Sequence, residues 1–179
     1  MKNRAMIVTL LTLVLATVCS AQMGGDKSQR PSPPVSASCD LGRGKTITTD
    51  YSSPRMKGRT IYGGLVPFGK VWRTGANEAT TFVTNADLIV GGAKVPAGNY
   101  TIFTIPNPDK WTLIINKKTG ESGIPYKYES DELARVDMKV STLPSPVENF
   151  TITYDKTASG CMLRLDWDTT RAAVDISAK

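Results

Sequence analysis

The amino-acid sequence predicts an all-β fold, an antiparallel β-sandwich or jelly-roll-like single domain, with a closed β-barrel as the alternative. Three observations lead to this prediction. Apolar and polar residues alternate in one short segment after another, these segments are rich in Thr, Val, Ile and aromatic residues, and turn-forming residues separate them. Alternation with period two buries one face of a strand, and such residues pack well on a pleated surface. Short strands with hairpin-length connections are typical of sandwiches and small barrels.

Six segments show the alternation. In the clearest of them, Val136, Met138 and Val140 alternate with charged residues, as in a strand with one buried face. The six predicted strands are 100–105, 111–115, 136–140, 150–154, 163–167 and 172–176. Turn signals lie between or before them at 95–99, 107–110, 118–120 and 144–146. A helical pattern occurs at 130–133 and is one or two turns long.

The first 21 residues have the pattern of a secretory signal peptide. Two basic residues precede the apolar stretch 5–18, and small residues follow at 19–21, so we predict cleavage after Ala21 and a periplasmic or secreted protein. Two alternatives stay open. One is a retained membrane anchor, although a bilayer needs about 20 apolar residues, and the other is a lipoprotein attached through Cys19. No later segment is apolar enough to span a membrane.

Beyond the signal peptide, the sequence predicts a tether and one domain. Residues 22–38 are rich in Gly, Ser and Pro without periodicity, which predicts a disordered tether. Residues 39–179 then form a single β-rich domain, long enough to bury a core without a metal. It contains Cys39 and Cys161, which could form a disulfide in an oxidising compartment. The alternative is two unrelated thiols.

Composition excludes several classes of function. Histidine is absent, which removes Ser-His-Asp and Cys-His catalysis and histidine-ligated metal sites. No glycine-rich phosphate loop, calcium-hand spacing or nucleic-acid-binding motif occurs, so we predict no cofactor, no metal and no nucleic-acid partner. The net charge of +6 is unevenly distributed: seven basic residues accompany one acid over 43–73, whereas eleven accompany thirteen acids over 74–179.

The segment 51–80 interrupts the alternating pattern. It contains two prolines and five glycines among its basic and aromatic residues, which favours an irregular loop region that faces a ligand. Arginine binds anions with two parallel hydrogen bonds, and aromatic rings pack against ligands. The candidate ligand-binding residues are Arg55, Arg59, Tyr62, Trp72, Arg73, Asn77, Glu78 and Thr80.

A structural interpretation of the same residues stays open. In it, Arg73 pairs with Glu78 inside the fold, Asn77 bonds loop backbone and Trp72 packs in the core. Loss of Arg73 would then leave a buried carboxylate unpaired and cost about 3–5 kcal/mol.

Four runs of the sequence resemble a bacterial exported family catalogued as domain of unknown function number twenty-nine eleven: YSSPRMKGRTIYGGLVPFGKVWRTGANEATTF, PAGNYTIFTIP, WTLIINKKTG and PVENFTI. The resemblance covers about 45–176 and is most specific over 51–80. It implies no activity, substrate or catalytic residue. It does imply a compact β-rich domain of the bacterial envelope, and it groups into one motif Arg55, Arg59, Trp72, Arg73, Gly75, Asn77, Glu78 and Thr80.

Three functions follow as hypotheses. The first is an exported module that binds a polar or anionic small ligand, glycan or peptide on its basic loop face. The second is a structural or interaction component of the bacterial envelope with a protein partner. The third is a hydrolase that uses Glu78 as general acid or base, with Asp50 as a second carboxylate. The spacing of these residues does not require catalysis, so the binding module is the prediction.

Overall fold

The computed structural model describes residues 26–179. The predicted signal peptide 1–21 and the first four residues of the predicted tether lie outside this range. The described chain contains no α-helix, so the all-β prediction is confirmed. Its elements are η1 (Lys27–Gln29), β1 (Pro34–Gly42), β2 (Lys45–Ser52), β3 (Thr80–Thr84), β4 (Leu88–Val90), β5 (Ala93–Val95), β6 (Gly98–Ile105), β7 (Lys110–Asn116), η2 (Glu129–Asp131), β8 (Glu132–Lys156) and β9 (Gly160–Ala178).

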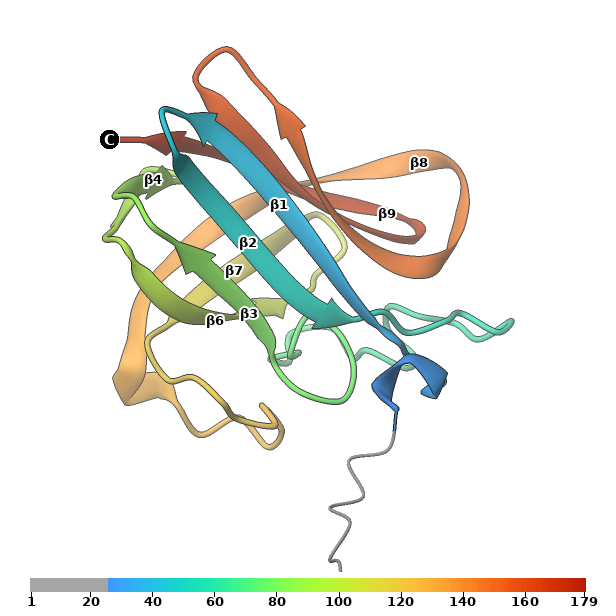
Figure 1. The fold of residues 1–179 in the computed structure, drawn as a ribbon. Coiled ribbons are helices and arrows are strands. Elements are labelled where there is room, and N and C mark those ends of the chain that lie inside the picture. Colours follow the sequence, from blue (N-terminus) through green and yellow to red (C-terminus); the bar gives the residue numbers. More distant parts are fainter. Residues whose placement is uncertain (1–25) are drawn as a thin grey trace, which may run out of the picture.

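The strands form one antiparallel sheet in the order β1-β2-β3-β6-β7-β8-β9-β4-β5 (Figure 1). Its two outer strands, β1 and β5, do not pair with each other. The sheet is therefore open, and the alternative of a closed barrel is wrong. None of the helices in the described part of the chain is long and apolar enough to cross a membrane.

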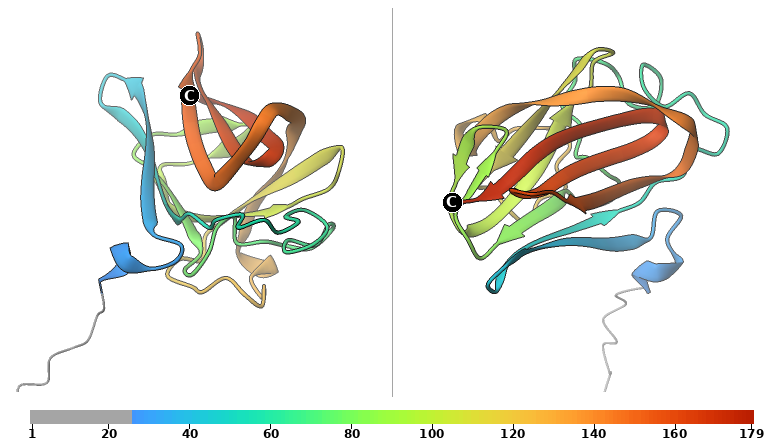
Figure 2. Two further views of the ribbon diagram at one scale, coloured as in Figure 1. Left: turned by 90° about the vertical axis from the view of Figure 1, so that its right-hand side faces the viewer. Right: turned by 90° about the horizontal axis from the view of Figure 1, so that it is seen from above.

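The long hairpin of β8 and β9 turns the open sheet into a sandwich-like fold. Its pairing is interrupted between Thr142 and Val147 and again between Val147 and Thr151. We call this interrupted region of the hairpin the corner. Beyond this corner, the hairpin lies opposite β1 and β2 (Figure 2). Two contacts join these parts: the Ile152 amide donates to the Tyr51 hydroxyl at 3.0 Å, and the Thr49 and Tyr154 hydroxyls lie 2.6 Å apart. The buried core lies between the two parts of the folded sheet.

The corner also corrects the predicted turn at 144–146. These residues do not end a strand but belong to β8. Proline has no N–H to donate to a neighbouring strand and is therefore tolerated where pairing is interrupted. The predicted strands 136–140 and 150–154 are consequently two halves of β8, and 163–167 and 172–176 are two halves of β9.

Cys39 and Cys161 form a disulfide with a Cα–Cα distance of 6.6 Å. It links β1, at one edge of the sheet, to the beginning of β9. Ordered structure also begins earlier than predicted. β1 starts at Pro34 and η1 at Lys27, so the predicted disordered tether 22–38 is wrong where the structure describes it. The helical pattern at 130–133 overlaps only the short η2.

Candidate functional site

The irregular segment 53–79 connects β2 to β3 and is fixed to the sandwich by isolated backbone bridges. Ala76 bridges Ser52, Arg55 bridges Asn149 of β8, and Trp72 bridges Thr104 of β6. The segment therefore runs along one end of the sandwich (Figure 1). The prolines and glycines that prevent a regular strand here leave a set of short, ordered loops.

An aromatic cluster forms the floor of this region. The Trp72 ring stacks on Trp167 of β9, with ring centroids 5.9 Å apart and planes 18° apart. Its indole N–H donates to the Gly75 carbonyl at 3.0 Å, which closes the 72–75 turn. Trp72 packs against the core yet remains partly exposed, so it serves the core and the surface together.

A pocket of about 400 Å³ opens above Trp72 and Trp167. Four of the eight predicted residues line it: Arg59, Trp72, Arg73 and Asn77. Lys70, Ser32 and Ile124 were not among the predicted residues but also line it. Arg55 lies in an adjoining pocket of about 210 Å³, together with Lys57 and Arg59. The two pockets share Ser32 and Arg59, which makes a continuous basic face.

Arg73 does not form the predicted pair with Glu78. Its Nη1 donates to two backbone carbonyls, those of Asn77 and of Ser122, the latter at 3.0 Å. These bonds hold the 73–77 turn against the 121–123 loop. The structural interpretation is therefore wrong in its central pair, and loss of Arg73 would not leave the Glu78 carboxylate unpaired.

Glu78 pairs instead with the N-terminal segment. Arg30 donates to both carboxylate oxygens at 2.9 and 3.0 Å, and the Lys27 ammonium lies 3.1 Å away. The neighbouring Asn77 donates from Nδ2 to the Ser32 carbonyl at 2.9 Å. Asn77 and Glu78 thus hold residues 27–32 beside the pocket. No local sequence pattern indicates that this N-terminal segment contacts Asn77 and Glu78.

The pKa of Glu78 is lowered to about 2, chiefly by the hydrogen bonds from Arg30 and also by those from its own backbone and Lys27. Because this pKa lies below the ordinary value of 4.5, ionised Glu78 favours the fastened state above pH 4.5, and we expect this contribution to be lost as the pH falls toward 2.

An NMR titration of the Glu78 carboxyl carbon should have its midpoint near pH 2. In Arg30→Gln the midpoint should rise toward 4.5; a midpoint near 4.5 in the unmodified protein would contradict the pairing.

Glu78 also lines a second pocket, of about 390 Å³, which includes Asp50. The fold therefore brings to one pocket the two carboxylates considered for hydrolysis. A general acid in glycoside hydrolysis needs a raised pKa, whereas the pKa of Glu78 is lowered. Glu78 therefore does not supply that acid.

Two other predicted residues support the fold: Thr80 is buried and Tyr62 is partly buried. The Thr80 hydroxyl donates to the Thr74 carbonyl at 2.7 Å and is buried, so it supports the 74–80 turn. The Tyr62 ring packs edge-on against Trp72, Trp111 and Trp167. Its hydroxyl is buried without a hydrogen-bond partner. Burial raises the pKa of Tyr62, and the charges of Asp168 and Asp166 raise it further.

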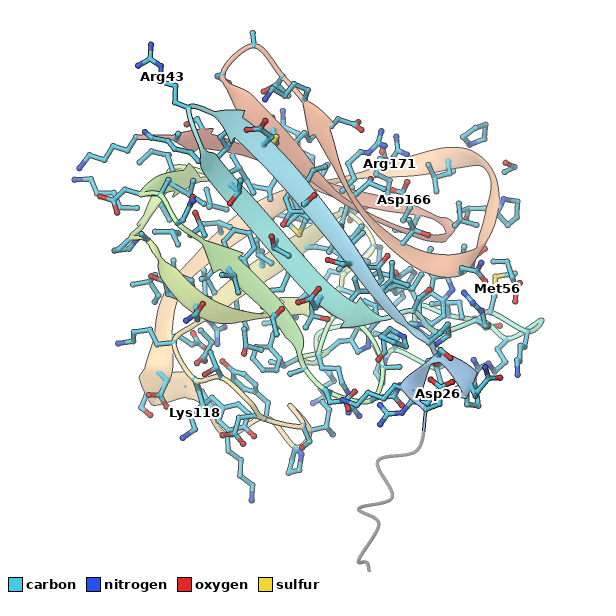
Figure 3. All side chains as sticks on the ribbon, in the orientation of Figure 1. Asp26, Arg43, Met56, Lys118, Asp166 and Arg171 are labelled. Carbon is cyan, nitrogen blue, oxygen red and sulfur yellow. A yellow bond between two sulfur atoms is a disulfide. The ribbon has the colours of Figure 1, made fainter. Side chains whose placement is uncertain are left out.

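The basic stretch 43–73 does not form one surface. Arg43 lies in the β1–β2 turn, far from Met56 of the irregular segment (Figure 3). Lys45 donates to the Lys179 carbonyl at 3.1 Å, also away from the pocket. Only the bases from Arg55 onward lie at the candidate site. Within residues 26–179, no group of three or more His, Cys, Asp or Glu side chains could hold a metal ion.

A family model described as "Protein of unknown function (DUF2911)" matches residues 32–176. The chain belongs to this family. The DUF2911 match includes the whole irregular segment and every pocket residue named above, whereas Lys27 and Arg30, the partners of Glu78, precede it. No curated protein matches the chain. No solved structure matches it either.

Proposed function

We propose that this domain is an exported binding module that holds a small anionic ligand, such as a carboxylated sugar or a phosphate ester, in the pocket above Trp72. The composition of the pocket is the observation that supports this most directly. Arg59, Lys70 and Arg73 line it, and none of its lining residues is a carboxylate. Its volume of about 400 Å³ falls in the usual range of small-molecule sites, about 300–1,000 Å³.

Within residues 26–179, the cations around the pocket form no salt bridges. None of the five bases in 55–73 forms a salt bridge with a described residue, whereas Arg30, Arg135 and Arg171 all do. Unneutralised cations in a concavity concentrate positive potential and attract anions. The Nε and Nη2 atoms of Arg73 also bond no described residue, which leaves two parallel donors for a carboxylate or phosphate.

The pocket wall suits the rest of such a ligand. Besides the cations, the pocket has an apolar lining that includes Trp72, Trp167, Val71 and Ile124. Binding sites for small molecules typically combine an apolar lining with a few polar groups that fix orientation. A ligand with an anionic group and a ring or short chain would suit both the cations and the apolar residues.

The other functions are less well supported. For hydrolysis, Glu78 is held by Arg30 and Lys27 and its pKa is low, so it is a weak base and is not protonated at neutral pH. For an envelope scaffold, the outer edge of β1, which pairs with no described strand, offers a place for a partner strand. That edge does not explain why the cations of segment 55–73 form no salt bridge with a described residue.

A thermal-shift screen of the purified protein tests the proposal. Galacturonate and glycerol 3-phosphate should raise the Tm, and glucose should not. At a ligand concentration 100 times the Kd, the stabilisation is about 2.7 kcal/mol, which corresponds to roughly 5–10 °C for a chain of this size. Failure of every anion in the screen would contradict the proposed function.

The variant Arg73→Gln should lower the affinity for the anion at least tenfold, because a charge-assisted hydrogen bond contributes about 1.5–3 kcal/mol. The fold should lose no more than about 1–2 kcal/mol, since glutamine can still donate to a carbonyl and Glu78 keeps its partners. Arg43→Gln is the matched control and should change neither quantity, because Arg43 lies in the remote β1–β2 turn. Isothermal titration and thermal melting measure both; equal loss of affinity in the two variants would point to net charge and not to the pocket.

A further inference from the structure

Exposed apolar side chains gather at the mouth of the pocket. The described chain exposes five large hydrophobic residues. Leu65 (47% exposed) and Ile124 (43%) line the pocket, and Phe68 (40%) follows Leu65 in the same loop. The other two, Val35 and Val83, lie on β1 and β3. Scattered apolar residues on a surface are ordinary, but a cluster at a binding site indicates an interaction surface.

The loop that carries Leu65 and Phe68 is ordered by its own backbone. The amides of Leu65 and Val66 donate to the carbonyls of Thr60 and Ile61 at 3.0 and 2.9 Å, and the Gly63 amide donates to Val66 at 2.9 Å. The Phe68 ring lies close over Gly63, where an added Cβ would be 2.9 Å from the ring. With Ile61 and Val66 buried beneath, the loop presents Leu65 outward from a firm base.

Basic residues line the same pocket as Leu65 and Ile124, and the pocket that adjoins it. Lys57, Arg59, Lys70 and Arg73 all belong to the two adjoining pockets, and none of the residues that line either pocket is acidic. Exposed apolar side chains among cations are typical of proteins that bind the surface of an anionic membrane, where the apolar groups enter the interface and the cations face phosphates. A small soluble anion would need only the cations and the pocket, and gives no reason for Leu65 and Phe68 to face outward.

We infer that this face docks onto a bilayer containing anionic phospholipid, with a lipid phosphate at Arg59, Lys70 and Arg73 and with Leu65, Phe68 and Ile124 in the interface. The inference rests on the proposed function, since the lipid phosphate is the anion that the pocket holds. An acidic protein surface could pair with the cations. It would bury the apolar side chains only if it carried apolar residues at positions that match theirs. A fluid bilayer meets both requirements without such a match.

Co-sedimentation with vesicles tests the inference. The purified protein should bind vesicles that contain both phosphatidylglycerol and phosphatidylcholine. Its affinity for vesicles of phosphatidylcholine alone should be at least tenfold lower. Binding to the anionic vesicles should weaken as the salt concentration rises, because salt screens exposed charges. The variant Phe68→Ser, at an exposed residue that does not line the pocket, should lose at least tenfold in vesicle affinity yet bind soluble glycerol 3-phosphate as the unmodified protein does. Val83→Ser, at a site 37% exposed on β3, is the matched control and should bind vesicles normally.

The outcomes separate the inference from the proposed function. Binding of glycerol 3-phosphate without binding of anionic vesicles would overturn the inference and leave the function standing. If the protein bound neither glycerol 3-phosphate nor anionic vesicles, the inference and the proposed function would both be overturned. Vesicle binding that survives unchanged in Phe68→Ser, or binding to poly-glutamate as tight as to the vesicles, would show that charge alone acts and would overturn the inference. A melting curve that matches the unmodified protein establishes that Phe68→Ser is folded.

Discussion

Reduction of the Cys39–Cys161 disulfide should lower the free energy of unfolding by about 5 kcal/mol. The bond joins residues 122 apart in the sequence, and closing a loop of that length removes about this much chain entropy from the unfolded state. It is also the covalent link between β1 and the beginning of β9. Because small domains are stable by only about 5–15 kcal/mol, the loss should be a large part of the total, with a fall in Tm of roughly 10–20 °C.

Thermal melting with and without a phosphine reductant measures this effect. Reduction keeps both sulfur atoms in the core, so it separates loss of the bond from loss of volume. The double variant Cys39→Ser, Cys161→Ser is the control: it should melt early, and the reductant should not change its Tm. An unmodified protein whose Tm is unaffected by complete reduction would contradict the prediction.

Replacement of Trp167 by Ala should cost about 3–5 kcal/mol, the usual effect of removing a buried indole. The side chain is 1% exposed, stacks on Trp72 and donates from its indole N–H to the Glu148 carbonyl at 3.1 Å. The change should also weaken binding of an anion in the pocket, because Trp167 supports Trp72 from below and lines the pocket.

Trp167→Phe separates these contributions. It keeps an aromatic ring but loses the bond to Glu148, so it should lose clearly less stability than Trp167→Ala. Chemical denaturation gives the free energies, and the anion titration gives the affinities. A Tm for Trp167→Ala within about 2 °C of the unmodified protein would mean that the β9 corner does not depend on this cluster.

The sequence predicted the C-terminal half of the sheet well and the N-terminal half poorly. All six alternating segments lie in β6, β7, β8 or β9. In β2 and β3 the inward positions include Thr49, Thr80 and Thr84, which are buried. Threonine counts as polar in an alternation pattern, and only tertiary partners such as the Tyr154 hydroxyl make its burial acceptable.

The sequence predicted only part of the candidate site, because some of its residues meet only through tertiary contacts. The glycines, prolines and bases of 53–79 mark a loop region with local chemistry, and Arg59, Trp72, Arg73 and Asn77 do line the pocket. Trp167 was predicted as an ordinary strand residue, and no local pattern relates it to Trp72. Ser32 reaches the pocket only because Asn77 bonds it from 45 positions away.

By itself, the amino-acid sequence determined that this chain is built of strands and where its irregular basic segment lies, because both depend on neighbouring residues: alternation sets which face of a strand is buried, and glycine and proline set where strands cannot continue. Only the tertiary structure decided which charges are neutralised. Glu78 pairs with Arg30, and Arg73 bonds backbone carbonyls. Charge pairing depends on which distant segments the packed sandwich brings within a few ångströms, and alternation along the chain carries no information about that.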